Sequence, residues 1–284
     1  MDLVTSRGEL RATVGRWREA GLRVGLVPTM GSLHHGHLAL VEHAKRRTDR
    51  VVASVFVNPL QFGPHEDFAR YPRDVDRDRL LLAERGTDLL YAPSVAEMYR
   101  APPVIRVDPG ALADRLEGAV RPGHFAGVLT VVAKLFHQAG PDVACFGQKD
   151  IQQATLIQRM VSDLDWPIEI VVVPTVRDPD GLALSSRNRF LSPSERQQAL
   201  VLARMLKAVE RAWRSGIVSG AELLIEARDV LATVPAVRSD YAVIVDPERL
   251  EPLEVVGPGA IVAVAARVGT TRLIDNLILG EATE

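Results

Sequence analysis

The sequence predicts an α/β fold in which a doubly wound parallel sheet is followed by a smaller α+β domain. Three observations lead to this prediction. Apolar runs alternate with helical patterns through the first two thirds of the chain. These runs are rich in Val and Ile and do not alternate with polar residues, which is typical of strands buried on both faces. The pattern then changes near residue 174, where helices are followed by strands.

The first domain is predicted from strands and helices that alternate along the chain. The strands are 24–27, 51–57, 89–91, 143–146 and 168–173, and the helices between them are 38–48, 74–86, 127–139 and 151–163. In such sheets ligands bind beyond the carboxyl ends of the strands. Polar motifs follow Val27, Val57 and Phe146. We therefore expect a Rossmann-like, ligand-binding domain over residues 1–175.

The second domain is predicted to begin after a turn. Asp178-Pro179-Asp180-Gly181 has turn chemistry, because Pro sets φ and Gly tolerates positive φ. Ser192, Pro193 and Glu195 form a capping box that opens a helix. The remaining elements are helices 193–213 and 219–231 and strands 241–245, 260–268 and 272–279. We expect residues 176–284 to be a smaller domain that acts as a lid.

Composition excludes several classes of protein. A net charge of −2 gives no general attraction to nucleic acid. No apolar run approaches the length of a membrane span, and the first residues are too polar for a signal peptide. The single Cys145 rules out an internal disulfide and fits a reducing compartment. We expect a cytoplasmic protein without nucleic-acid or membrane partners.

The first motif, Pro28–His37, combines a strand end, a Gly-bearing turn and the start of a helix. Unpaired N–H groups and the helix dipole favour an anion at such a place. Gly31 lets a phosphate approach the backbone, and His34 and His37 share a face three residues apart. The motif His-x-x-Gly-His is typical of nucleotidylyl transferases and class I aminoacyl-tRNA synthetases. Surface histidines are the alternative, and a zinc site is disfavoured because further ligands are lacking nearby.

The second motif follows the strand that ends at Val57. Pro59 stops the strand, and Asn58 and Gln61 then project at the edge of the sheet. Their amides can donate and accept hydrogen bonds, which suits a substrate with hydroxyl and carboxylate groups. A turn with solvated amides is the alternative, and it is the better interpretation of this motif taken alone.

The third motif follows Phe146. Gly147 allows close approach of a ligand, and Lys149 offers a positive charge for a phosphate. Asp150 can bind a ribose hydroxyl or cap the next helix, and both roles are compatible. Gln153 lies one helical turn further on and faces the same edge of the sheet. Cys145 is predicted to be a small core residue.

The fourth motif lies beyond the predicted hinge. Ser185, Ser186 and Arg187 place two hydroxyls and a guanidinium on one loop, which suits a leaving pyrophosphate. Such a loop can close over a substrate and exclude water. The alternative is a plain surface loop.

Two weaker features complete the set. Arg121 and His124 are candidates for a second phosphate contact. Asp74, Asp76 and Asp78 could help to hold Mg²⁺, but a solvated helix face is the favoured interpretation.

The four motifs, in this order and spacing, closely resemble the pantoate–β-alanine ligase family. The late segment 269–276 resembles it too, and the likeness extends over roughly residues 4 to 279. The resemblance implies that the pantoate carboxylate attacks the α-phosphate of ATP, which releases pyrophosphate. The amine of β-alanine then attacks the pantoyl adenylate and releases AMP. It also implies ATP and Mg²⁺ as requirements and a homodimer.

The resemblance also implies roles for individual residues. The catalytic residues are His34, His37, Lys149 and Arg187. ATP is bound by Met30, Gly31, His34, His37, Gly147, Lys149, Asp150, Val176, Leu184, Ser185, Ser186 and Arg187. Pantoate is bound by Asn58, Gln61 and Gln153, and β-alanine by Gln61. The metal ligands are left open. The chain departs from the expected family pattern at His35, Gln148 and Leu184.

Two other functions fit parts of the pattern. A nucleotidylyl transferase would leave the nucleotide on its product, and Gln61 with Gln153 argues instead for a small hydroxy acid. A nucleotide- or RNA-binding module without activity is disfavoured by the mild acidity and by Lys149 and Arg187.

Overall fold

The computed structural model describes residues 1–63, 68–101 and 103–281. Its contacts divide the chain into two compact units, and each is described by itself. The first unit is Met1–Gly147 with Gln152–Pro174, and the second is Gln148–Ile151 with Thr175–Glu284. The second unit therefore takes four residues from the middle of the sequence of the first.

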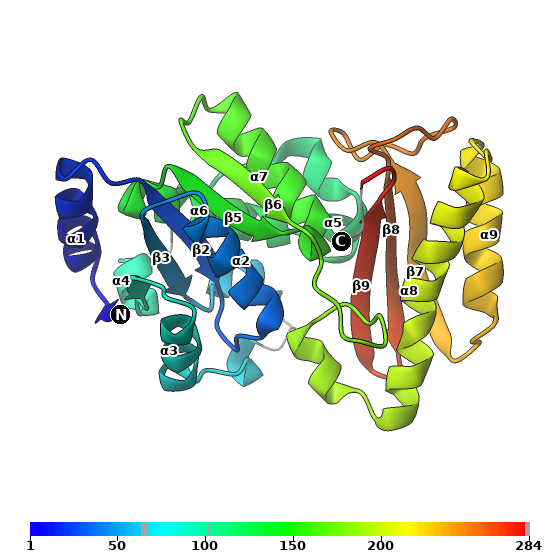
Figure 1. Cartoon of the computed structure of the whole chain (residues 1–284), viewed down its shortest axis with the longest axis horizontal. Helices are drawn as coiled ribbons and strands as arrows, with labels where there is room; N and C mark the ends of the chain where they lie inside the picture. The colour runs from blue at the N-terminus through cyan, green and yellow to red at the C-terminus, as the bar shows by residue number, and fades with distance from the viewer. Residues whose placement is uncertain (64–67, 102, 282–284) are drawn as a thin grey trace. The chain divides into compact units, whose positions relative to one another are not determined.

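The first unit is built on a six-stranded sheet in the order β1-β4-β3-β2-β5-β6, and all of its pairings are parallel. Figure 1 labels the neighbouring strands β3, β2, β5 and β6 of this sheet. Its strands are β1 (Asp2–Val4), β2 (Val24–Thr29), β3 (Arg50–Val55), β4 (Leu89–Tyr91), β5 (Val143–Gly147) and β6 (Glu169–Val173). The strand order reverses direction between β2 and β5. Open α/β sheets bind ligands at such a switch point, and the first and third motifs follow these two strands.

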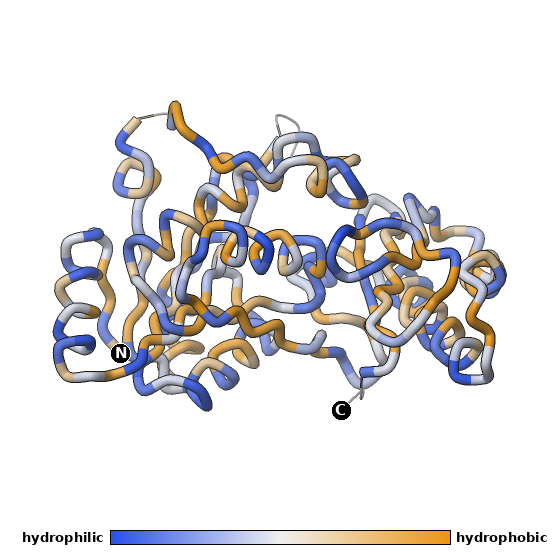
Figure 2. The backbone as a smooth tube through the Cα atoms, turned by 90° about the horizontal axis from the view of Figure 1, so that it is seen from above, coloured by the Kyte–Doolittle hydropathy of each residue, from blue (hydrophilic) through white to orange (hydrophobic). Residues whose placement is uncertain are grey.

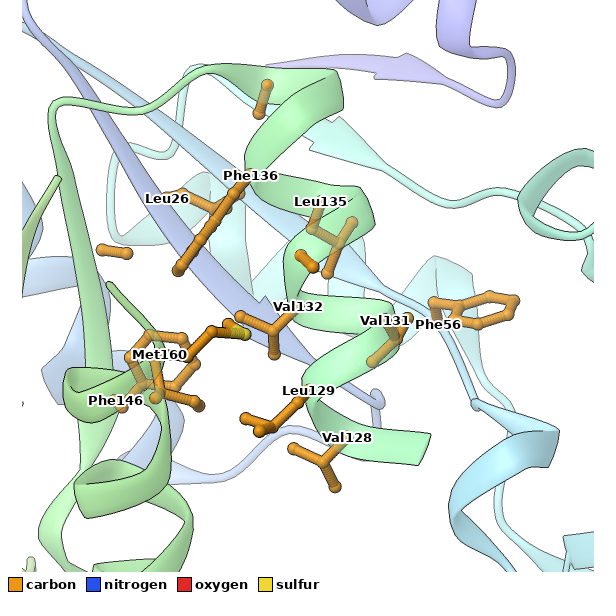
Figure 3. Packing of buried hydrophobic residues seen from close by; sticks show 14 of the residues in the cluster. Leu26, Phe56, Val128, Leu129, Val131, Val132, Leu135, Phe136, Phe146 and Met160 are labelled. Atoms are coloured by element: carbon orange, nitrogen blue, oxygen red, sulfur yellow. The ribbon is translucent and has the colours of Figure 1, made fainter. Parts of the chain in front are cut away.

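The sheet is covered on both faces, as a doubly wound fold requires. Its main helices are α1 (Arg7–Glu19), α2 (His35–Lys45), α3 (Val75–Glu84), α6 (His124–Ala139) and α7 (Ile151–Asp163), and α4 (Val95–Met98) and α5 (Leu116–Val120) are short. Leu26 of β2 packs in a core with α1, α6 and α7, whereas the next residue, Val27, packs in a second core with α2 and α3. Figure 3 shows part of the first core, where α6 side chains such as Val132 and Phe136 lie near Phe146 and Met160.

The predicted fold class is confirmed, but two elements were not anticipated. β1 and α1 precede the first predicted strand. Ser6 caps α1 by accepting from the N–H of Glu9, and the Glu9 carboxylate accepts from the N–H of Ser6. This capping box was visible in the sequence. Helix α2 also begins at His35 rather than at residue 38, because His34 is its N-cap.

Aspartates close the amino-terminal edge of this sheet. Asp49, Asp88 and Asp142 each directly precede a strand. Asp142 accepts from the N–H of Val24 at 2.7 Å, and Asp88 accepts from the N–H of Val51 at 2.9 Å. Asp49 accepts from the N–H of Arg23 at 2.8 Å. Backbone donors at the beginning of neighbouring strands thus find partners, which backbone groups require when water is excluded.

The second unit contains an antiparallel sheet in the order β7-β8-β9 with two helices packed against it (Figure 1). Its elements are α8 (Pro193–Arg214), α9 (Gly220–Ala232), β7 (Val237–Val245), β8 (Ile261–Val268) and β9 (Thr271–Ile278). The predicted capping box at Ser192 is confirmed, with Glu195 as its partner. Apolar residues of α8 and β8, such as Leu202, Leu206 and Val264, form the core.

Hydropathy along the backbone agrees with these packing arrangements. Figure 2 shows apolar and polar residues alternating along the helices, as expected where one face is buried. Among the described residues, none of the helices is both long and apolar enough to cross a membrane.

Candidate active site

A tight turn follows β2 and leads into α2. Gly31 has φ of +83° and Ser32 has φ of +54°, so the backbone passes through the left-handed region twice in succession. Asp78 of α3 holds this turn, because its carboxylate accepts from the N–H of Ser32 at 2.9 Å and of Leu33 at 2.8 Å. A Cβ at Gly31 would lie 2.8 Å from Oδ2 of Asp78. Glycine is required here by the positive φ and by this contact.

The interpretation of Asp78 as part of a solvated helix face is therefore wrong. Its side chain is 1% exposed, and burial raises the pKa of its carboxyl above the ordinary value, although the two N–H donors act in the opposite direction. Asp74, by contrast, caps α3 through the N–H of Arg77. Asp78 lies four residues before the buried Leu82 and on the same helix face, which was the available signal.

The two predicted imidazoles lie together at the start of α2. Their ring centroids are 4.1 Å apart, so the predicted shared face is confirmed. Nδ1 of His34 accepts from the N–H of Gly36, and Nδ1 of His37 accepts from the N–H of His34. A backbone N–H can only donate, so a neutral ring in this arrangement carries its proton on Nε2. In a neutral ring of either residue Nε2–H is therefore the donor, and a donor of this kind suits phosphate oxygens.

The amides of the second motif are buried rather than solvated, so the alternative of solvated amides is wrong. Asn58 is 1% exposed and Gln61 is 8% exposed. Asn58 caps the 3-10 helix η1 (Pro59–Gln61) and donates to Oε1 of Gln61 and to the carbonyl of Gly127. Tyr99 donates to Oδ1 of Asn58 at 2.9 Å, a contact between residues 41 apart that the motif alone does not indicate. A Cβ at Gly127 would overlap the carbonyl of Leu60, so α6 packs closely against η1.

Arg121 and His124 support the same segment. Nδ1 of His124 lies 2.8 Å from the backbone carbonyl of Gln61, and Arg121 donates to that carbonyl at 3.3 Å. Arg121 also contacts Nε2 of His124 at 3.0 Å. These two residues therefore hold the backbone of the second motif in place, and their contact with a phosphate stays a prediction.

The residues that follow β5 differ in environment. Gln152 is 3% exposed and its amide donates to the carbonyls of Leu112 and Arg115, so its role is structural. Gln153, the predicted ligand-binding residue, is half-buried and makes no hydrogen bond to the side chains or loops that the structure describes.

Cys145 is fully buried within β5, and burial raises the pKa of its thiol to about 12, which fits the predicted core role.

The second unit contains the remaining residues of the third motif. Asn276 of β9 donates to the carbonyls of Gln148 and Lys149, and accepts from Nε2 of Gln148. Nζ of Lys149 lies 3.9 Å from Oδ1 of Asp150. The late segment 269–276 therefore holds the backbone around Lys149 through Asn276. The sequence alone did not indicate this contact.

The fourth motif lies on a hairpin in the second unit. Leu184 donates to the carbonyl of Val176, and the predicted turn at Asp178 is confirmed by a bond from the N–H of Gly181 to its carbonyl. Ser185 caps η5 (Ser186–Phe190) by accepting from the N–H of Arg187.

The arginine side chains near this hairpin differ in whether they form ion pairs with carboxylates. Arg177 makes a bidentate ion pair with Asp275, with distances of 2.7 and 2.9 Å, and Arg196 pairs with Asp178 and Asp180. The guanidinium of Arg187, in the described part of the chain, has no ion-pair partner. A half-buried guanidinium in this state suits an anionic ligand.

No cluster of three or more potential metal-ligating side chains occurs among residues 1–63, 68–101 and 103–281. Both carboxylate oxygens of Asp78 already accept backbone N–H groups. This environment does not fit an all-protein Mg²⁺ cage.

The parallel sheet with its switch point and paired imidazoles at a helix start defines a nucleotide-binding α/β enzyme. A family model described as pantoate-beta-alanine ligase matches residues 2–278. The chain therefore belongs to the pantoate–β-alanine ligase family.

Individual relatives agree with this assignment. Pantothenate synthetase from Acidobacterium capsulatum is 56% identical over 258 residues, which cover 91% of this chain and 86% of the relative. The crystal structure of pantothenate synthetase from Thermus thermophilus has a TM-score of 0.92 at 54% identity, over 98% of this chain and 99% of that one. A ligase from Francisella tularensis, complexed with beta-gamma ATP and beta-alanine, has a TM-score of 0.80 at 32% identity, over 98% and 97% of the two chains.

Proposed function

We propose that the chain joins pantoate to β-alanine through a bound pantoyl adenylate. Family membership makes it an ATP-dependent ligase that forms an amide bond in pantothenate biosynthesis, and the match over residues 2–278 carries this conclusion. In the first step a pantoate carboxylate oxygen bonds to the α-phosphorus of ATP and pyrophosphate leaves. In the second step the β-alanine nitrogen bonds to the acyl carbon, AMP leaves, and the amine loses a proton.

The histidine pair is proposed to act on the phosphates. Nε2–H groups of His34 and His37 would donate to oxygens that gain charge as the α-phosphate is attacked. Donors that are already oriented lower the barrier because little reorganisation is needed during the reaction. Met30, Gly31 and Gly147 are proposed to lie along the nucleotide.

Lys149 and Arg187 are proposed to stabilise the departing pyrophosphate. Asp150, Val176, Leu184, Ser185 and Ser186 are proposed to complete the ATP site. Asn58, Gln61 and Gln153 are proposed for the pantoate site, where Asn58 acts through Gln61 and Gln61 also contacts β-alanine. The family resemblance supports these roles, and the buried Asn58 and Gln61 add a physical reason, since buried amides hold a fixed direction.

The organisation of the whole protein is proposed on the same basis. Residues 1–175 would bind nucleotide and pantoate, and residues 176–284 would act as a lid. Mg²⁺ would enter with the phosphates of ATP. We also propose a cytoplasmic homodimer, which light scattering of the purified chain would test against a 31.0 kDa monomer.

The decisive experiment is exchange of labelled pyrophosphate into ATP. The adenylate route requires exchange with pantoate present and β-alanine absent, and no exchange without pantoate. If exchange required β-alanine, the reaction would be concerted and the adenylate proposal wrong. Mass spectrometry of the products separates AMP release from transfer of the nucleotide to a product.

A further inference from the structure

The orientation of the Asn58 side-chain amide is determined by two backbone groups. Oδ1 of Asn58 accepts from the N–H of Leu60 at 3.2 Å, and Nδ2 donates to the carbonyl of Gly127 at 3.0 Å. A backbone N–H can only donate and a carbonyl can only accept. A flipped amide would oppose both, so oxygen and nitrogen are assigned here by partners of known polarity.

The orientation of Gln61 follows from that of Asn58. Nδ2 of Asn58 lies 3.1 Å from the Gln61 amide, and a donor at that position requires the oxygen Oε1 to face it. Nε2 of Gln61 then points the other way, where it lies 2.9 Å from Sδ of Met30. A thioether sulfur is a weak acceptor, so a substrate oxygen would be a better partner for this N–H₂ group.

Tyr99 lies at the other end of this chain of hydrogen bonds. Its hydroxyl is 2.9 Å from Oδ1 of Asn58, and because that atom only accepts, the hydroxyl must donate. The side chain is buried at 8% exposure, with Phe56 beside its ring and Nζ of Lys134 5.5 Å from the ring centroid. Burial raises the pKa of the Tyr99 hydroxyl, which keeps its proton in place.

We propose that Tyr99 is a positioning residue for pantoate: through Asn58 it locks the Gln61 amide with only its N–H₂ group toward the substrate. The direction is Tyr99 O–H to Asn58 oxygen, Asn58 N–H to Gln61 oxygen, and Gln61 N–H to a substrate oxygen. Gln61 thus selects a carboxylate or hydroxyl oxygen and rejects a donor at that point. This inference rests on the proposed placement of pantoate at Gln61.

The first test compares two buried tyrosines in the same unit. Tyr91 also donates to a side-chain amide oxygen, that of Gln138 at 3.0 Å, and makes no hydrogen bond to Asn58 or Gln61. Removing one hydrogen bond of this kind changes an equilibrium by about five- to tenfold. We expect Tyr99→Phe to raise the pantoate KM in pyrophosphate exchange by about that factor, with the ATP KM unchanged. Tyr91→Phe, the matched control, should leave both constants unchanged.

The second test changes the polarity of Gln61. Gln61→Glu keeps an oxygen toward Asn58 but places a second oxygen where the N–H₂ group stood. We expect it to raise the pantoate KM more than Gln61→Ala does, with partial recovery as pH falls and the introduced carboxyl gains a proton. Circular dichroism of each variant checks that it is folded.

The outcomes separate the inference from its premise. If Gln61→Ala and Gln61→Glu both leave the pantoate KM unchanged, the proposed placement of pantoate is wrong, and this inference falls with it. If Gln61→Ala raises that constant and Gln61→Glu does not, pantoate is placed correctly and the donor orientation is wrong. If both raise it as expected but Tyr99→Phe behaves like Tyr91→Phe, the role of Tyr99 is wrong.

Discussion

The two edges of the six-stranded sheet use carboxylates and amides in different ways. At the amino-terminal edge, Asp88 and Asp142 accept from N–H groups near the start of neighbouring strands. At the carboxyl-terminal edge, Asp78 and Asn58 also bind backbone groups, but the segments they hold carry His34, His37 and Gln61. The first edge joins strands to one another, and the second fixes turns that carry residues proposed to bind substrate. The same type of contact therefore joins strands at one edge and holds the proposed site residues at the other.

The largest effect is expected at the carboxyl-terminal edge from His37. An Asn side chain can imitate Nδ1 and a Gln side chain can imitate Nε2. His37→Asn should slow adenylation on the order of 10²- to 10³-fold, as loss of an oriented donor does, while His37→Gln retains about tenfold more activity. Single-turnover adenylation measures both rates. Equal rates for the two variants would contradict the assignment of the proton to Nε2.

An intermediate effect on both stability and activity is expected from Asp78→Asn. One N–H of the turn would then face an amide N–H₂ group, which costs about 1–3 kcal/mol for a buried group left unsatisfied. Urea unfolding gives this cost, and the ATP KM should rise because the turn before His34 loosens. If the variant lost stability but kept the same ATP KM, Asp78 would contribute to folding stability and not to ATP binding.

The loss of stability in Asp78→Asn should depend on pH. Burial raises the pKa of Asp78 above 3.8, so the folded protein binds this proton more tightly than the unfolded chain does. The resulting stabilisation is present below 3.8 and is lost as pH rises through the raised pKa. Asp78→Asn should thus destabilise the protein more in acid than at neutral pH. Urea titrations at both conditions measure the difference, and an opposite trend would contradict the direction of the shift.

A smaller effect, on stability alone, is expected at the amino-terminal edge. Asp142→Ala removes the acceptor of the Val24 N–H and should lower the free energy of unfolding by about 1 kcal/mol. The KM values for ATP and pantoate should not change, since β2 keeps its other pairings. A change in either constant would show that the two edges are coupled.

The smallest effect is expected from Asp49→Ala. Asp49 is exposed, so water can replace it as the acceptor for the N–H of Arg23. The free energy of unfolding should fall by less than about 1 kcal/mol, and by less than in Asp142→Ala. If Asp49→Ala lost more stability than Asp142→Ala, burial would not determine how much these contacts stabilise the protein.

The site residues that local spacing defines were accessible from the sequence. His34 and His37 are three residues apart at a helix start, and their rings do lie together. The aspartates before three strands were equally readable, as Asp88 and Asp142 stand next to an apolar run and Asp49 is separated from such a run by one residue. The strand order was not, because it depends on which strands pair across long connections.

The contacts that fix the site come from distant parts of the sequence. Asp78 binds the N–H of Ser32 from 46 residues away, and Tyr99 binds Asn58 from 41 residues away. Asn276 reaches the carbonyl of Lys149 across 127 residues. One sequence gives no signal for such pairings, because only tertiary packing brings these residues together.

The discontinuous second unit has a consequence for dividing the protein into fragments. A cut between Pro174 and Thr175 would leave Lys149 on one piece and Asn276 on the other. The carboxyl-terminal piece would lack the four residues Gln148–Ile151, so truncation at the apparent boundary cannot yield the second unit intact. Two separately expressed fragments would have to reassemble, with the bonds of Asn276 becoming intermolecular, and activity would then depend on fragment concentration. If activity returned when the two fragments were mixed, that activity would report their association. The association would depend on the contacts of residues Gln148–Ile151 with the second unit.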